Sequence, residues 1–433
     1  MLNVEQLEAF NIIKTTNDSI FITGPPGVGK SYLLNEIVIY FKQMNIKYGI
    51  TASTGCAAIL INGQTLHSYL GIGLAKKSVD LLYNNACRNR QLYNKLRDLE
   101  VLIIDEISMI DINLFEKISE YLSKINNNKL PFGNIRLILI GDFCQLPPIN
   151  GDYCFKSKIW SNLNIKTVQL KSSMRHADEF LLVHILDSIR KGRIDKNIYN
   201  KLLELENTEF KDIVPTKLYC LKKDVDEINE RRFDIQYALN NNIHLLNDCT
   251  EHKNNNTIIC YSNSDTNNII KKEENNFIYE YKCYSSDLEL DNSQYSVKLI
   301  KNAQVMITRN INLDAGLVNG KRGVIVNLTK TYVIISDIDN KKYKINYYTD
   351  ENTNNMTYTT FMPLTLAYAI TVHKSQGCTI DAVQIDSGQN NFAPGQFYTA
   401  LSRAKSLKHI KLVNLHKDAF IINKDVEEFY KNI

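Results

Sequence analysis

Residues 24–31 read GPPGVGKS, which is the composition of a loop that binds phosphate groups. Glycine permits backbone conformations in which successive N–H groups point at an anion, and the N-terminus of a following helix adds its dipole. At this spacing Lys30 should reach the β- and γ-phosphates of a nucleotide, and the hydroxyl of Ser31 should coordinate Mg²⁺. The motif therefore predicts a site for a nucleoside triphosphate, formed by Gly24, Pro25, Pro26, Gly27, Val28, Gly29, Lys30 and Ser31.

A pair of carboxylates, Asp105 and Glu106, directly follows the apolar run 101–104. Because the C-terminal ends of parallel strands meet at one edge of a sheet, Asp105 should lie beside the phosphate loop and hold Mg²⁺ directly or through water. Glu106 is then placed to orient and deprotonate an attacking water. A helix N-terminus also favours acidic residues, so the pair by itself leaves that alternative open.

An amide side chain, Gln145, lies in the motif GDFCQLPP (141–148) after a further apolar run. Such an amide can donate to a γ-phosphate and lose that contact on hydrolysis, which is the least that a nucleotide sensor requires. Taken alone, the same motif also fits a polar loop stiffened by two prolines.

Two arginines, Arg175 and Arg403, are candidate cations from outside the loop. Phosphoryl transfer spreads negative charge over the γ-phosphoryl oxygens, and arginines supplied from elsewhere can stabilise that charge. An arginine from a second domain would also make hydrolysis depend on domain closure. A surface salt bridge is the alternative for either residue.

The elements that must position these residues alternate between strands and helices in the first part of the chain. Short, nearly continuous apolar runs are typical of a parallel sheet covered on both faces, and residues 112–125 carry hydrophobic side chains at helical spacing. The runs are 20–23, 48–51, 101–104, 137–140 and 166–170. The pattern predicts a doubly wound α/β domain with its site at the C-terminal ends of the strands.

The remainder of the chain is less regular. Residues 177–240 are expected to be mostly helical, with an apolar face formed by Phe180, Leu181, Val183, Leu186 and Ile189. The asparagine-rich stretch 241–268 is expected to be a loop or insertion. Residues 311–362 are expected to form a small β module, with strands at 323–328, 332–336 and 342–347, before α/β alternation returns at 363–433.

The composition is that of a soluble globular protein with two or three domains: 433 residues, 23% charged and 44% hydrophobic. A net charge of +4 is no global basic signature, so a nucleic acid would have to be bound by local stripes or a groove. The nine cysteines include no C-x-x-C pair, which indicates neither a zinc site nor a disulfide framework. We expect a reducing, intracellular location (nucleus, cytoplasm or viral replication site), because no membrane-length run or secretory leader is present.

Six motifs occur in an order that resembles the superfamily-1 helicases. The stretch 131–143, PFGNIRLILIGDF, and the helix pattern before it more specifically resemble the Pif-type (petite integration frequency) superfamily-1B DNA helicases. The motifs are GPPGVGKS (24–31), TASTGCAA (51–58), LIIDEISM (102–109), GDFCQLPP (141–148), AYAITVHKSQG (367–377) and FYTALSRAK (397–405). The resemblance covers nearly the whole chain.

This resemblance implies an ATP-dependent 5′→3′ DNA helicase with two RecA-like P-loop domains, 1–176 and 177–310 with 363–433, and an SH3-like β insert at 311–362. A strand-separating wedge subdomain would lie at about 68–100, although an ordinary helical linker would look similar. The implied partners are ATP, Mg²⁺, single-stranded DNA and forked or structured DNA, without a membrane. A monomeric motor acting in DNA replication, repair or recombination is expected.

Further site residues follow from the matching motif positions. Gln6 matches the residue that reads the adenine edge, and Gln376 and Gly377 match the motif that lies between nucleotide and DNA. Small hydroxyls and imidazoles suit phosphate hydrogen bonds that carry no sequence information. The DNA-binding positions implied in this way are Thr54, Thr65, His67, His373 and Ser375.

Two other functions fit the same motifs. One is a nucleic-acid-dependent ATPase or translocase that does not unwind. The other, an RNA motor, fits less well, because nothing in the sequence reads the 2′-hydroxyl directly.

Overall fold

The computed structural model describes residues 2–149, 151–171, 180–210, 215–240, 278–285, 295–309, 311–312, 315, 317, 321–337, 340–352, 357–377, 380, 382–388, 393–404 and 406–433. Arg175 and the asparagine-rich stretch 241–268 lie outside these residues. The chain separates into two compact units, residues 1–220 with 372–433 and residues 221–371, and each is described here by itself.

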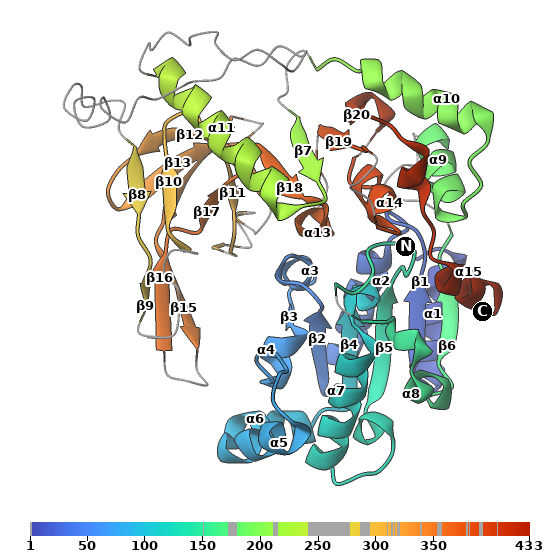
Figure 1. The fold of residues 1–433 in the computed structure, drawn as a ribbon. Coiled ribbons are helices and arrows are strands. Elements are labelled where there is room, and N and C mark those ends of the chain that lie inside the picture. The colour runs from blue at the N-terminus through green and yellow to red at the C-terminus, as the bar shows by residue number, and fades with distance from the viewer. Residues whose placement is uncertain are drawn as a thin grey trace. The chain divides into compact units, whose positions relative to one another are not determined.

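The first unit contains a six-stranded parallel sheet (Figure 1). Its order is β3-β2-β4-β5-β1-β6, so that β4 and β5 are the two middle strands and β1 lies next to β5. The strands are β1 (Ile20–Thr23), β2 (Tyr48–Ala52), β3 (Gln64–Thr65), β4 (Val101–Asp105), β5 (Arg136–Gly141) and β6 (Lys166–Gln169). The five strands predicted from apolar runs are confirmed. Strand β3 was not predicted, because two residues are too short to show a pattern.

Alternate residues of these strands enter two separate cores, as the period of two in a strand requires. In β4, Val101 and Ile103 pack with helices α1 (Val4–Thr15), α2 (Lys30–Gln43) and α3 (Gly55–Leu60). Leu102 and Ile104 face the other core, with α5 (Val79–Arg88), α7 (Ile112–Ile125), α8 (Lys158–Asn162) and α15 (Lys424–Lys431). Both faces of the sheet are therefore covered, and the predicted helix 112–125 is confirmed to the residue.

The region predicted as a wedge consists of short helices. They are α4 (Leu66–Leu70), α5 and α6 (Arg90–Arg97). Each begins at a capping side chain, Thr65, Ser78 or Asn89, whose oxygen accepts a hydrogen bond from a backbone N–H in the first turn.

A second parallel sheet in this unit has β19 (Val383–Asp386) between β7 (Thr216–Tyr219) and β20 (Ile410–Val413). The accompanying helices are α9 (Phe180–Arg190), α10 (Lys196–Glu204), α13 (Val372–Ser375) and α14 (Gln396–Leu401). The strand β7 lies in a region that was expected to be mostly helical.

The apolar face predicted for the helix at 180–190 is partly wrong. Phe180 is 84% exposed and Leu181 is 42% exposed. The buried stripe is formed by Leu182, Ile185, Leu186 and Ile189. These residues recur at steps of three, one and three, which keeps them on one side of the helix, whereas consecutive residues such as 180 and 181 point about 100° apart.

The second unit is mainly antiparallel. Helix α11 (Lys222–Asn240) precedes a five-stranded sheet of order β14-β13-β12-β11-β17 and two smaller sheets. The strands are β8 (Tyr279–Tyr281), β9 (Tyr284–Ser285), β10 (Val297–Leu299), β11 (Gln304–Ile307), β12 (Arg322–Leu328), β13 (Tyr332–Ser336), β14 (Lys342–Asn346), β15 (Tyr348–Asn352), β16 (Thr357–Phe361), β17 (Leu364–Leu366) and β18 (Ala369–Thr371). The three strands predicted within 311–362 correspond to β12, β13 and β14.

Among the described residues, no helix is both long enough and apolar enough to cross a membrane.

Candidate functional site

The phosphate loop connects β1 to α2 at the C-terminal edge of the six-stranded sheet. Gly24, Gly27 and Gly29 have φ values of +145°, +85° and +83°, which side chains disfavour. At Gly24 a Cβ atom would also lie 2.3 Å from the backbone oxygen of Leu170. Val28 is fully buried in the core between the sheet and α2, and so it anchors the loop from below. The loop is thereby held with its backbone at the start of α2.

Lys30, the first residue of α2, closes the loop. Its Nζ donates to the backbone oxygens of Gly24 at 2.7 Å and Pro25 at 3.0 Å. Burial lowers the pKa of Lys30, while the charges of Asp142, Glu106 and Asp105 oppose that shift. Within the described residues the ammonium has only these neutral carbonyls as hydrogen-bond partners, and such a buried cation is a favourable partner for a phosphate anion.

Asp105 and Glu106 lie where β4 ends. Burial and the charge of Glu106 raise the pKa of Asp105 to about 7, against the N–H of Glu106 and the charge of Lys30. That N–H donates to Oδ1 of Asp105 at 2.9 Å. Glu106 itself has φ +53° and ψ +46°, a left-handed conformation that is costly for a residue with a side chain and is typical of functional sites.

The side chain of Glu106 is bound by Gln376, which directly follows α13. Nε2 of Gln376 donates to Oε2 of Glu106 at 2.9 Å. The Oε1 atoms of Gln376 and Gln145 are buried and have no hydrogen-bond partner within the described part of the chain. An unpaired buried amide oxygen costs free energy, so each is suited to accept a hydrogen bond from a further donor. Of the two side chains, Gln145 lines the cleft described below.

Arg403 is the second cation of the site and is 2% exposed. Its guanidinium donates to the backbone oxygen of Thr399 at 2.9 Å and to Oγ of Ser402 at 2.8 Å. A longer bond of 3.4 Å reaches the backbone oxygen of Ser375. The side chain of Arg403 lines the same cleft as Lys30 and Glu106, which places a positive charge where an anion would bind.

These groups line one cleft of about 310 Å³. It brings together residues from the phosphate loop, the end of β4, the loop after β5 and the two late motifs. Its lining is Pro26, Gly27, Gly29, Lys30, Ser31, Ala57, Asp105, Glu106, Gln145, Gly377 and Arg403. The structure therefore gathers the predicted Lys30, Ser31, Asp105, Glu106, Gln145, Gly377 and Arg403.

The donor set of the cleft fits a nucleotide with Mg²⁺. Loop N–H groups, Lys30 and Arg403 suit the phosphates, and the hydroxyl of Ser31 with the carboxylate of Asp105 supplies the hard oxygen ligands that Mg²⁺ prefers. In the described residues no group of three or more His, Cys, Asp or Glu side chains could hold a metal. A metal bound here would take much of its coordination from phosphates and water, as Mg²⁺ commonly does.

Gln6 lies beside the phosphate loop, and it also caps a helix. Its Oε1 accepts from the N–H of Asn3 at 3.0 Å, and its Nε2 lies 3.3 Å from the backbone oxygen of Gly29 and 3.4 Å from that of Val28. The side chain is fully buried. Its assignment as an adenine reader stays a prediction.

The predicted DNA-binding residues do not share one environment. The hydroxyls of Thr54 and Thr65 accept from the backbone N–H of Ala57 and of Ser68, both at 3.2 Å, and so cap α3 and α4. Burial lowers the pKa values of His67 and His373, which favours the neutral imidazole, although the charge of Asp111 opposes the shift at His67. Ser375 is buried, and its hydroxyl donates to the backbone oxygen of Val372 at 2.7 Å.

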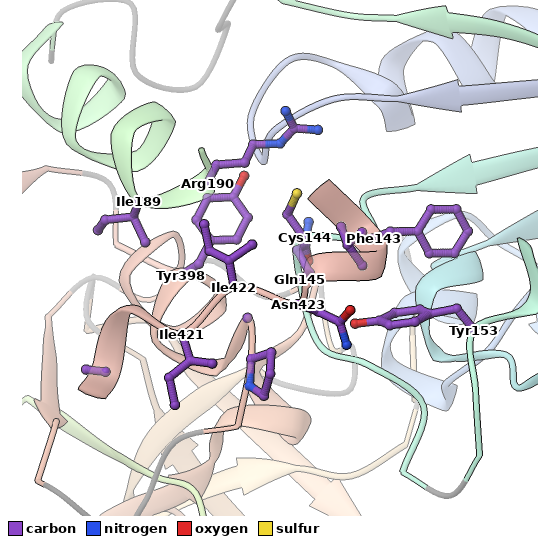
Figure 2. Close-up of a pocket in the computed structure, with 14 residues that line it drawn as sticks. Phe143, Cys144, Gln145, Tyr153, Ile189, Arg190, Tyr398, Ile421, Ile422 and Asn423 are labelled. Atoms are coloured by element: carbon purple, nitrogen blue, oxygen red, sulfur yellow. The ribbon is translucent and has the colours of Figure 1, made fainter. Parts of the chain in front are cut away.

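Sequence reasoning missed a cluster around Asp142, next to the predicted Gln145. Asp142 is fully buried and forms an ion pair with Arg190, the last residue of α9. Tyr398 and Tyr430 also donate to its carboxylate, at 3.0 and 3.1 Å. Figure 2 shows Arg190 and Tyr398 with Cys144 and Gln145 around the pocket at this place. The only local signal was an arginine at the end of an apolar helical stripe.

Comparisons with known proteins agree over the whole chain. The family described as PIF1-like helicase matches residues 1–197, and that described as DNA helicase Pif1, 2B domain, matches residues 294–328. The chain is 31% identical to the ATP-dependent DNA helicase Pif1 of Bdellovibrio bacteriovorus, over 99% of this chain and 92% of that protein.

Two solved structures are similar throughout. A crystal structure of the Pif1 helicase from Candida albicans has a TM-score of 0.80 and 27% identity, covering 100% of this chain and 99% of that chain. A Bacteroides Pif1 helicase in complex with ADP-AlF3 and ssDNA has a TM-score of 0.71 and 25% identity, covering 100% and 98%. The predicted fold class, two RecA-like P-loop domains with parallel sheets, is thereby confirmed. The SH3-like character of the insert stays a prediction.

Proposed function

We propose that this chain, which belongs to the PIF1-like helicase family, is an ATP-dependent DNA helicase that translocates 5′→3′ on single-stranded DNA and unwinds duplex or structured DNA. The observation that carries the proposal is the hydrogen bond between Gln376 and Glu106. It joins the carboxylate beside the phosphate loop to the helix that bears His373, a predicted DNA contact. ATP hydrolysis at Glu106 and DNA binding at His373 would then be linked through Gln376.

The side chains of the cleft divide the hydrolytic work. Lys30 would leave the carbonyls of Gly24 and Pro25 for the β- and γ-phosphates. Glu106 would orient the attacking water and accept its proton, and Gln145 would bond the γ-phosphate only while it is present. Arg403 would stabilise the charge that develops on the γ-phosphoryl oxygens.

Ser31 and Asp105 would hold Mg²⁺, which would supply neutralisation of the phosphate charge. The raised pKa of Asp105, about 7, is that of the carboxyl without a metal. A nearby cation favours the ionised form, so Asp105 would act as a carboxylate when the site is loaded.

DNA binding is proposed to act on Glu106 through Gln376. A helix of four residues, α13, separates β18 from Gln376, and His373 lies within it. A DNA strand that displaced α13 on binding would change the hydrogen bond between Gln376 and Glu106. It would thereby change how readily Glu106 accepts a proton.

We also propose the domain division 1–176, 177–310 with 363–433, and 311–362, with a wedge at about 68–100. Roles in the nucleotide or DNA site are proposed for Gln6, Thr54, Thr65, His67, Ser375 and Arg175.

Replacing Arg403 with alanine should lower the turnover of DNA-stimulated ATP hydrolysis roughly 100-fold, which is typical for loss of one transition-state donor. The KM for ATP should change little, because Lys30 and the loop remain. Arg193→Ala removes an exposed arginine elsewhere in the same unit and is the matched control. Unchanged turnover in Arg403→Ala would remove this residue from the catalytic set.

The test of the whole function is strand separation on tailed duplexes. With ATP and Mg²⁺, a duplex with a 5′ single-stranded tail should be unwound and one with a 3′ tail should not. Hydrolysis stimulated by DNA without any strand separation would favour a non-unwinding translocase. Greater stimulation by RNA than by DNA of equal length would favour an RNA motor.

A further inference from the structure

One carboxylate collects hydrogen bonds from three separate helices. The side chain of Asp142 is 0% exposed, and its carboxylate accepts hydrogen bonds from Nε and Nη2 of Arg190, both at 3.1 Å. It also accepts from the hydroxyls of Tyr398 and Tyr430, at 3.0 and 3.1 Å, and from the N–H of Cys144 at 3.1 Å. Arg190 lies in α9, Tyr398 in α14 and Tyr430 in α15. Asp142 therefore ties the loop after β5 to all three helices.

A network of this kind is an expensive way to obtain stability alone. Desolvating a buried ion pair costs about as much as its attraction returns, and apolar replacements are often as stable. What a fully bonded network supplies is fixed geometry, because each bond has a preferred length and direction. We therefore ask which elements the Asp142 network holds in position.

Helix α14 is held against the loop after β5 at a second point. Gly395, which precedes α14, has φ +79°, and a Cβ atom there would lie 2.1 Å from the backbone oxygen of Gln145 and 2.6 Å from that of Cys144. The helix thus rests directly on the backbone of Gln145. Arg403 follows two residues after the end of α14 at Leu401, and both Gln145 and Arg403 line the nucleotide cleft.

We propose that Asp142 and Tyr398 are positioning residues for ATP hydrolysis, which hold α14 on the loop of Gln145 so that Gln145 and Arg403 face the γ-phosphate in a fixed relation. This inference rests on the proposed function. Arg190 supplies the charge that keeps Asp142 ionised, and Tyr430 adds a bond to Thr23 at 2.7 Å, at the end of the strand before the phosphate loop. Gln145 and Arg403, which come from different elements, would then keep a fixed position relative to each other.

The test removes one hydroxyl. In Tyr398→Phe, steady-state ATPase with saturating DNA should show kcat lowered about tenfold, the value expected for losing a hydrogen bond to a charged group, with the KM for ATP within about twofold. Tyr121→Phe is the matched control, since its hydroxyl is also buried and donates to the backbone oxygen of Leu70 at 3.2 Å, and Tyr121 is not one of the residues that line the cleft. It should lose stability similarly and keep its kcat.

A second pair of variants acts on the backbone contact. Gly395→Ala should lower kcat with little change in KM, because its methyl group must displace the carbonyls of Cys144 and Gln145. Gly151→Ala carries a comparable backbone penalty at φ +106°, but the nearest atoms to its methyl group all belong to the side chain of Asp111, the closest being Cβ at 3.2 Å, and its kcat should be retained. Tyr398→Phe and Gly395→Ala combined should lose less than the product of their separate effects, because both release the same helix.

The outcomes separate two failures. A wild-type chain that hydrolyses no ATP overturns the proposed function, and this inference with it. An active wild type whose Tyr398→Phe variant keeps its kcat, or loses no more than Tyr121→Phe does, overturns the inference alone.

Discussion

Replacing Glu106 with glutamine should lower DNA-stimulated ATP hydrolysis about 1,000-fold, within the range that a general base contributes. An amide has nearly the same shape as the carboxylate but cannot take a proton from water. The bond from Gln376 can persist, because the amide oxygen of the new side chain accepts in place of Oε2. Unwinding should stop with hydrolysis, while the fold is kept.

Nucleotide binding separates this effect from a general loss of the site. Glu106→Gln should bind a fluorescent ATP analogue at least as well as the wild type, since a negative charge near the γ-phosphate has been removed. Glu120→Gln changes an exposed glutamate of α7 in the same way and should behave as the wild type. Full hydrolysis in Glu106→Gln would assign the base to another residue.

Replacing Arg190 with methionine should lower the free energy of unfolding by roughly 3–5 kcal/mol, because it leaves the carboxylate of Asp142 buried without its cation. Lys191→Met is the matched control: the neighbouring lysine pairs with Asp187 at 2.7 Å, but both side chains are nearly half exposed, and such pairs contribute at most about 1 kcal/mol. Asp142→Asn combined with Arg190→Met should recover much of the loss. A single Arg190→Met variant as stable as Lys191→Met would contradict the assignment.

Fluorescence of Trp160 provides the measurement for this unit. Trp160 is the single tryptophan of the chain, and its ring centre lies 5.8 Å from that of Phe143, the residue after Asp142. Urea unfolding followed at this residue therefore reports on the core that adjoins the Asp142 cluster. The slope of the unfolding free energy against urea concentration should stay unchanged if the substitution alters stability alone.

The pH dependence of this loss has a definite sign. In the wild type, burial opposes the charged form of Asp142, but the charge and hydrogen bonds of Arg190, with Lys30 and the N–H of Cys144, hold the pKa below its usual value. That carboxylate stabilises the fold above its unfolded pKa of about 4 and loses this effect only as the pH falls through the lower folded value. Without Arg190, burial would raise the pKa, so the variant would gain stability as the pH falls from 7 toward about 4. The difference in unfolding free energy between the wild type and Arg190→Met should therefore become smaller as the pH falls from 7 toward about 4.

Local sequence patterns were sufficient to predict an element wherever the physical cause of that element lies within one short segment. The strands at 20–23, 101–104 and 137–140 were predictable because nearly continuous apolar runs belong in a sheet that is covered on both faces. The helix Ile112–Ile125 was predictable from the spacing of its hydrophobic side chains, and the structure adds a capping carboxylate, that of Asp111. The exposed Phe180 was not, since an apolar residue at a helix start does not say which side faces the core.

The sequence alone was enough to predict a nucleotide and Mg²⁺ site at the phosphate loop with Asp105 and Glu106, because phosphate and metal binding require particular residue types at short, fixed spacings. It also offered Gln145 and Arg403 as candidates for the same site. Only the tertiary structure decided which of these groups touch. The partners Glu106 and Gln376 are 270 residues apart, and Thr23 and Tyr430 are 407 apart. No local pattern specifies such pairs, because they depend on how whole helices pack. The buried Asp142 with Arg190 belongs to the same class: each residue is unremarkable in sequence, and the burial that makes the pair matter exists only after folding.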